Sequence, residues 1–227
     1  PKTKKGLKMT CEVNLIALSK PSASTECFTA SDLIAYTARV SNPANQKNTA
    51  TAPKLLRYLI KENHWSPFEM VHMTLEIKTT RDIARQILRH RSFSFQEFSQ
   101  RYAEATTFIT DRECRTQDTK NRQNSNTTDD KSLKEWWSME QTEIAKNAEQ
   151  SYREALGKGI AKEQARALLP EGLTESTLYM SGTLRSWIHY CELRRGHGTQ
   201  KEHMEVAERC WNIIGVHFPD VISALNG

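Results

Sequence analysis

The sequence of 227 residues lacks the features that mark membrane-spanning, secreted and metal-binding proteins. It holds no run of about 20 apolar residues, so we expect no membrane span and no membrane partner. No apolar stretch typical of a signal peptide follows the basic N-terminal residues, and we therefore predict a cytoplasmic location. None of the five cysteines forms a CxxC pair, and an odd number of cysteines without a secretion signal indicates reduced thiols.

Metal-binding patterns are also missing. The seven histidines are scattered along the chain, and neither an HExxH motif nor a Cys/His zinc pattern occurs. His64 and His90 are conceivable ligands, but no third ligand accompanies them. We therefore predict that the protein binds no metal.

Positive charge is concentrated near one end of the chain. The formal net charge is +5, and four lysines carry most of it: Lys2, Lys4, Lys5 and Lys8. We expect residues 1–10 to form a flexible basic tail. The rest of the chain is almost neutral, which argues against one alternative function, a basic nucleic-acid-binding module, because phosphate contacts need clustered cations. We predict no nucleic acid as a partner.

Residues 11–227 carry mixed helix and strand patterns that predict a single α+β catalytic domain. The clearest strand is 70–78, where Val71, Met73, Leu75 and Ile77 alternate with polar residues. Shorter extended segments are predicted at 12–18, 101–109 and 177–181. Amphipathic helices are predicted at 33–40, 52–63, 80–89, 133–156, 160–169, 184–193 and 199–217. Residues 110–131 are nearly devoid of apolar side chains and predict a long polar surface loop.

Three arginines, Arg81, Arg85 and Arg89, follow one another at four-residue intervals in a predicted helix. Like charges at that spacing repel by about 0.2–0.5 kcal/mol per pair. The row therefore indicates either a bound anion or neighbouring carboxylates. For Arg81 and Arg85 we favour structural salt bridges.

The segment 89–101, RHRSFSFQEFSQR, and the residues just before it offer groups that suit a nucleotide. Guanidinium groups bind phosphate bidentately, while amide, carboxylate and hydroxyl groups can contact base edges and ribose. These groups belong to Gln86, Arg89, Gln96, Glu97, Ser99 and Arg101.

Three later arginines have apolar neighbours, which indicates that they are partly buried and directed at a partner. They are Arg166, Arg185 and Arg194. Salt bridges to Glu163 or Glu192 are the alternative for each of them.

Arg89-His90-Arg91, followed after seven residues by Ser99, resembles the RHR-x7-S signature of the flavin-dependent thymidylate synthases. The context around it, ARQILRHRSFSFQEFSQRY, resembles the core segment of that family. HWSPFEM at 64–70, ARALLP at 165–170 and LRSW…ELR at 184–194 match further family blocks in the same order. The resemblance extends from about residue 13 to about residue 219.

The resemblance implies a reaction and an architecture. Enzymes of this family methylate dUMP to dTMP with methylenetetrahydrofolate as carbon donor, and NADPH reduces their FAD. The implied fold is a mixed α/β domain with a central antiparallel sheet flanked by helices. The implied assembly is a homotetramer in which neighbouring subunits share each active site.

The resemblance also assigns site residues. Arg194 would be catalytic, because it matches the arginine that polarises the uracil ring. The residues expected to bind dUMP are Gln86, Arg89, Glu97, Phe98, Ser99, Gln100, Arg101, Arg166 and Arg194. The residues expected to bind FAD are Ser66, Arg89, His90, Arg91, Glu97, Thr183, Arg185 and His189, with Ser66 coming from another subunit.

Three positions depart from the family pattern. Thr183 and His189 stand where the family has asparagines, and Gly198 alters a His-Ala-Gln run that is here His197-Gly198-Thr199-Gln200. These departures leave open a second alternative function, a family member that binds nucleotide and flavin without catalysis.

Two side chains near the motif invite a nucleophilic role. Ser99 could attack the substrate, but no paired base is evident from the spacing, and a hydrogen bond to the substrate is the preferred interpretation. Cys191 could add to C6 of a pyrimidine; the alternative is a small buried side chain. The aromatic side chains Phe93, Phe95 and Tyr102 could stack on a ring or simply pack.

Overall fold

The structure, a computed structural model, describes residues 11–109 and 111–226, so the predicted basic tail lies outside the described residues. Its centre is a four-stranded sheet in the order β1-β2-β6-β3. The strands are β1 (Glu12–Leu18), β2 (His72–Thr80), β6 (Glu175–Thr183) and β3 (Ser94–Glu97). Every neighbouring pair is antiparallel, which confirms the predicted α+β fold with a central antiparallel sheet.

The two faces of this sheet differ in polarity. Met73, Leu75 and Ile77 of β2 are buried, together with Leu178 and Met180 of β6. The alternating residues carry hydrogen bonds on the other face, for example from Tyr179 Oη to Glu76 Oε2 at 2.9 Å. The alternation in the sequence therefore predicted both the strand and its buried face.

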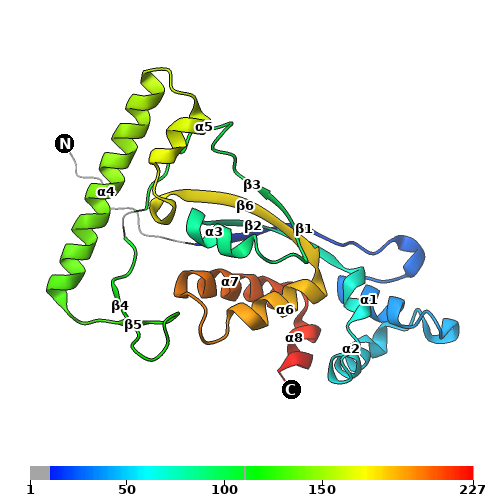
Figure 1. Ribbon diagram of the computed structural model, residues 1–227. Coiled ribbons are helices and arrows are strands. Elements are labelled where there is room, and N and C mark those ends of the chain that lie inside the picture. Colours follow the sequence, from blue (N-terminus) through cyan, green and yellow to red (C-terminus); the bar gives the residue numbers. More distant parts are fainter. Residues whose placement is uncertain (1–10, 110, 227) are drawn as a thin grey trace.

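Helices cover the apolar face of the sheet (Figure 1). They are α3 (Arg81–Ile87), α6 (Leu184–Arg194) and α7 (Lys201–His217). Trp187 of α6 is fully buried, and its indole N–H donates to the carbonyl of Met73 in β2 at 3.0 Å. This hydrogen bond satisfies the polar atom of a large core side chain.

Three further helices lie at one end of the sheet, and two at the other (Figure 1). The first group is α1 (Ala30–Ala38), α2 (Ala52–Lys61) and α8 (Pro219–Leu225); the second is α4 (Lys131–Gly157) and α5 (Lys162–Ala165). Short 3-10 helices span Ala23–Thr25, Pro43–Asn45, Thr49–Thr51, Ser66–Met70, Arg166–Leu168 and Glu171–Leu173. A small second core, which includes Tyr152 and Ala165, joins α4 and α5 to the chain after β3.

Some predicted boundaries were wrong for local reasons. Helix α1 is capped by Thr29, whose hydroxyl accepts from the amide of Asp32 at 3.1 Å, so it starts before Ser31. Helix α3 ends at Ile87 because the amides of Arg89 and His90 bond back over three residues and turn the chain towards β3. Residues 101–109 form no strand; only Phe108 makes an isolated bridge, to Thr174.

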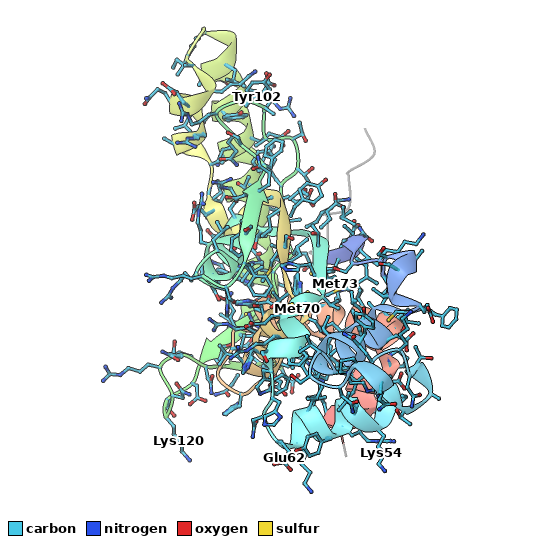
Figure 2. All side chains as sticks on the ribbon, turned by 90° about the vertical axis from the view of Figure 1, so that its right-hand side faces the viewer. Lys54, Glu62, Met70, Met73, Tyr102 and Lys120 are labelled. Atoms are coloured by element: carbon cyan, nitrogen blue, oxygen red, sulfur yellow. The ribbon has the colours of Figure 1, made fainter. Side chains whose placement is uncertain are left out.

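The predicted polar loop contains a small hairpin. Strands β4 (Arg115–Gln117) and β5 (Ser125–Thr127) pair with each other. Lys120 projects from the tip of this hairpin, away from the body of the protein (Figure 2). Two arginines of the same segment are instead held against the body, Arg112 by Asp82 at 2.8 Å and Arg115 by Glu202 at 2.5 Å. The segment is therefore an attached hairpin and not a plain loop.

Within the described ranges, no helix combines the length and the apolar character that a membrane span requires.

Candidate functional site

The RHR motif lies in the turn between α3 and β3, beside the central strand β6. Helix α3 carries Gln86, and the turn carries Arg89, His90 and Arg91. Strand β3 then pairs with β6, with Glu97 opposite Leu178. The motif is therefore anchored on one side by a helix and on the other by a sheet ladder.

Glu97 neutralises the row of arginines on α3. It lies 3.6 Å from Arg81 and 3.2 Å from Arg85, and Glu171 is 3.9 Å and 3.4 Å from the same two side chains. Ser176 Oγ also donates to Glu97 at 2.9 Å. The predicted salt-bridge role of Arg81 and Arg85 is confirmed. The carboxylate of Glu97, predicted to contact both ligands, already bonds three side chains of its own chain.

Arg89 and Arg91 are differently placed. Both are exposed, and neither is ion-paired within the part of the chain that the structure describes. Two cations next to each other repel unless an anion lies between them. These two guanidinium groups are therefore free to bind phosphate or another anion.

Arg194 contacts His90 directly. The Nε of Arg194 donates to Nε2 of His90 at 2.9 Å, so the imidazole is neutral and carries its hydrogen on Nδ1. Burial lowers the pKa of His90 to about 4, and the charges of Arg194 and Arg89 act in the same direction. The His90 ring packs edge-on against Tyr190, with the centroids 4.9 Å apart. The RHR motif and the last predicted block, 184–194, thus meet in the folded chain.

Gln86 is held by two side chains that follow α6. Its amide nitrogen donates to Gln200 Oε1 at 2.7 Å, and its carbonyl oxygen lies 3.3 Å from Nδ1 of His203. His203 is not among the predicted site residues. A signal existed, since His203 falls on the buried face of a helix with Val206, Ala207 and Cys210. A histidine at such a position needs a hydrogen-bond partner.

A first cavity, of about 560 Å³, lies beside β3. Its lining includes Phe98, Ser99 and Tyr102. Ser99 is exposed, and no base lies within hydrogen-bond distance of its hydroxyl among the described residues, so the geometry favours a hydrogen bond to a ligand over nucleophilic attack. The amide nitrogen of Gln100 is buried without a hydrogen-bond partner in the described ranges, whereas most buried polar atoms have one.

Arg101 and Arg166 converge on one residue. Arg101 Nε lies 3.4 Å from the Glu163 carboxylate, and Arg166 Nε donates to the Glu163 backbone carbonyl at 3.2 Å. Two arginines that are 65 positions apart in the sequence are thereby brought to the same place. Within the described residues, the alternative of a side-chain salt bridge to Glu163 or Glu192 is not seen for Arg166, Arg185 or Arg194.

A second cavity, of about 520 Å³, lies at the start of α6. Its lining includes Trp65, Ser66 and Arg185. Arg185 pairs with Glu69 at 2.7 Å, and the ring of His189 lies 5.5 Å from that of Trp65. Thr183 caps α6, and its hydroxyl accepts a hydrogen bond from the amide of Ser186 at 3.1 Å. Threonine, like the asparagine of the family pattern, is a residue type that caps helix N-termini.

Two of the predicted flavin residues, Glu97 and Thr183, lie at different points along β6. Glu97 lies opposite Leu178, whereas Thr183 follows five residues later on the same strand. At about 3.3 Å per residue these two positions are about 16 Å apart along the strand. The structure therefore does not gather all these residues around one point of a single chain.

Aromatic side chains of the motif are not equivalent. Phe93 is buried and packs on Trp187, with the ring centroids 4.8 Å apart. Tyr102 is 88% exposed and lies far from Met73 in Figure 2. Phe93 is thus a core residue, and of the two only Tyr102 is available for stacking. Among the described residues, no group of three His, Cys, Asp or Glu side chains could hold a metal ion.

The chain is similar to known proteins over nearly its whole length. The family described as "Thymidylate synthase complementing protein" matches residues 25–220. A probable flavin-dependent thymidylate synthase of Paramecium bursaria Chlorella virus 1 is 51% identical, over 93% of this chain and 97% of the relative. The flavin-dependent thymidylate synthase of a Synechocystis species is 53% identical, over 94% and 99%. The structure of PolB, a UMP/dUMP methylase from Streptomyces cacaoi bound with 5-Br dUMP, superposes with a TM-score of 0.83 at 26% identity, over 98% and 97%.

Proposed function

We propose that this chain, which belongs to the family of flavin-dependent thymidylate synthases, methylates dUMP to dTMP in the cytoplasm with FAD as its flavin. Methylenetetrahydrofolate donates the carbon and NADPH donates the electrons. The balanced reaction consumes dUMP, methylenetetrahydrofolate, NADPH and one proton, and it yields dTMP, tetrahydrofolate and NADP⁺.

The observation that carries this proposal is the contact between Arg194 and the neutral His90 next to Gln86. Carbon transfer to C5 of a pyrimidine places negative charge on the ring nitrogen and its neighbouring carbonyl. A guanidinium that is held in position stabilises this charge without reorganising. Arg194 is held by His90, and its terminal nitrogens make no hydrogen bond within the described residues.

The nucleotide phosphate requires cations and hydroxyl groups. Arg101 and Arg166 lie together near Glu163, and Ser99 lines the cavity beside β3. These positions match the family's dUMP residues. We infer that the nucleotide is surrounded by Phe98, Ser99, Gln100, Arg101 and Arg166. Its base is contacted by Gln86 and Arg194.

The residues present fit FAD. Its diphosphate needs unpaired cations, and Arg89 and Arg91 are exposed without ion pairs in the described ranges. Its ring system needs a hollow with aromatic walls, and the cavity of about 520 Å³ with Trp65, Ser66 and Arg185 offers one. When bound, FAD supplies the hydride that reduces the transferred carbon. His90, Glu97, Thr183 and His189 complete the proposed set.

We propose a homotetramer with shared active sites. The support is that Glu97 and Thr183, both expected at the flavin, lie about 16 Å apart along β6 of one chain. In a shared site, Ser66 comes from one subunit and the RHR motif from its neighbour. Mixing Arg91→Ala and Ser66→Ala subunits, each defective alone, is then expected to restore part of the activity.

One anaerobic experiment tests the function. The purified protein should be yellow, NADPH should bleach the flavin faster when dUMP is present, and dTMP should form when methylenetetrahydrofolate is added. A colourless protein that takes up no added FAD contradicts the proposal. Flavin reduction and dUMP binding without any dTMP would instead identify the non-catalytic alternative.

A further inference from the structure

We propose that Glu202 is a positioning residue that fixes the orientation of the Gln86 amide through Gln200, and so sets how the enzyme recognises the base. The inference rests on the proposed function in one respect, namely that Gln86 contacts dUMP. It assigns a role to a carboxylate that is not among the residues proposed to bind dUMP or FAD.

A continuous chain of hydrogen bonds joins the hairpin to Gln86. Arg115 of β4 donates to Glu202 Oε1 at 2.5 Å. Gln200 Nε2 donates to Glu202 Oε2 at 3.0 Å, and Gln86 Nε2 donates to Gln200 Oε1 at 2.7 Å. The chain thus connects three segments that are far apart in sequence.

The charge at the Glu202 end determines the direction of every bond. An ionised carboxylate can only accept, so Gln200 must turn its NH₂ group towards Glu202. The carbonyl of Gln200 then faces Gln86, so Gln86 must donate a hydrogen bond from its own NH₂ group. A glutamine alone has no such preference, because its two ends have nearly the same shape.

Glu202 is well suited to be the fixed end. It is buried, with 5% of its surface exposed. Burial raises the pKa of its carboxyl, but the hydrogen bonds and charge of Arg115, its own backbone amide and the Gln200 amide outweigh that effect, and the pKa is lowered. Glu202 therefore stays ionised at neutral pH.

The contact that the carbonyl oxygen of Gln86 makes with His203 is consistent with this orientation of the amide. Its Oε1 lies 3.3 Å from His203 Nδ1, and His203 Nε2 lies 3.1 Å from the Tyr190 hydroxyl. Burial lowers the pKa of His203 to about 3, with the charges of Arg194 and His90 acting in the same direction. A neutral His203 donates from Nδ1 to Gln86 and accepts from Tyr190 at Nε2. All six side chains from Arg115 to Tyr190 then have consistent donors and acceptors.

An oriented Gln86 amide keeps one N–H and one oxygen lone pair for a ligand, in a fixed arrangement. The N3–H and carbonyl edge of uracil complements this pair, whereas cytosine presents an acceptor at N3 and a donor amine beside it. We therefore expect the orientation of Gln86 to contribute to discrimination between dUMP and dCMP.

Glu202→Gln tests the proposal, because it keeps the size of the side chain and removes the fixed charge. We expect the Kd for dUMP to rise by about tenfold or more, as for the loss of one good hydrogen bond, and the preference for dUMP over dCMP to fall by a similar factor. Asp82→Asn is the matched control. It weakens the other ion pair of the same segment, to Arg112, and leaves the Gln86 chain intact, so dUMP binding should change less than twofold.

Gln200→Met gives a second, independent test. It cuts the chain but keeps the Arg115–Glu202 pair, so it should reproduce the effect of Glu202→Gln even if that variant folds poorly. The double variant should bind dUMP no worse than either single variant. Wild-type affinity and selectivity in Gln200→Met would overturn the proposal, whereas absence of dUMP binding in the unaltered protein would instead overturn the proposed function.

Discussion

The guanidinium of Arg194 and the imidazole of His90 form a hydrogen bond of 2.9 Å between residues 104 positions apart. The bond uses Nε of the arginine and leaves its two terminal nitrogens pointing elsewhere. It also keeps His90 neutral, because Nε2 must accept. One contact therefore fixes the position of a cation and the protonation state of its neighbour.

Replacing Arg194 by lysine tests the use of this cation. Lysine keeps the charge but lacks the planar fork, so it cannot bond His90 and the substrate in the same geometry. We expect kcat to fall by about 10²–10³-fold, as for loss of one oriented donor. Initial rates of dTMP formation measure it. Arg195→Lys is the control, since Arg195 pairs with Glu208 and lies over Trp211; equal losses in both variants would refute a specific role for Arg194.

Two buried histidines make stability depend on pH. Burial and the Arg194 charge lower the pKa of His90 to about 4 and that of His203 to about 3, below the unfolded value of about 6.5. In that interval the unfolded chain binds more protons. Their contribution to stability is therefore complete above about pH 6.5 and is lost as the pH falls towards about 4 for His90 and about 3 for His203.

Urea unfolding at several pH values checks this dependence. His203→Gln should reduce the slope of unfolding free energy against pH by up to about 1.4 kcal/mol per pH unit, the value for one proton. His197→Gln changes an exposed histidine and serves as the control. Identical slopes in His203→Gln and the unaltered protein would show that His203 is not a neutral buried group.

Cys191 and Cys210 are fully buried in neighbouring helices. Burial is the main reason that the pKa of each thiol is raised, so neither is a thiolate at neutral pH. We expect Cys191→Ala and Cys210→Ala to keep turnover within about twofold and to lose about 1–2 kcal/mol of stability through small cavities. A loss of turnover above about a hundredfold in Cys191→Ala alone, with flavin retained, would instead indicate covalent catalysis.

Periodic patterns explain what the sequence could predict of the fold. The alternation in β2 reflects a sheet with one apolar and one polar face, and both are visible in a single strand. The ends of elements depend on short-range bonds that several residues can make, as at Thr29 and Ile87. The hairpin at β4 and β5 escaped prediction because polar residues form it and ion pairs with the body hold it.

The sequence indicated few of the contacts between the candidate site residues. The four-residue spacing of Arg81 and Arg85 indicated carboxylates, but only folding brings Glu97 and Glu171 to them. His203 reaches Gln86 across 117 positions. Such pairs depend on helix packing and side-chain rotamers, which no local pattern encodes.

Because Gly182 has no side chain, the ring of Phe93, which follows the RHR motif, can pack directly against its backbone. A Cβ at Gly182 would lie 2.4 Å from Cδ1 of Phe93, and Phe93 is already packed against Trp187. Gly182→Ala should therefore lower the unfolding free energy by about 1–3 kcal/mol and weaken flavin binding, because Phe93 is two residues from Arg91. Urea unfolding and flavin content measure both effects. Gly157→Ala, where no atom lies within 4 Å, should cost nothing, and adding Phe93→Leu to Gly182→Ala should recover stability; a failure of that rescue would show that the clash with Phe93 is not the cause.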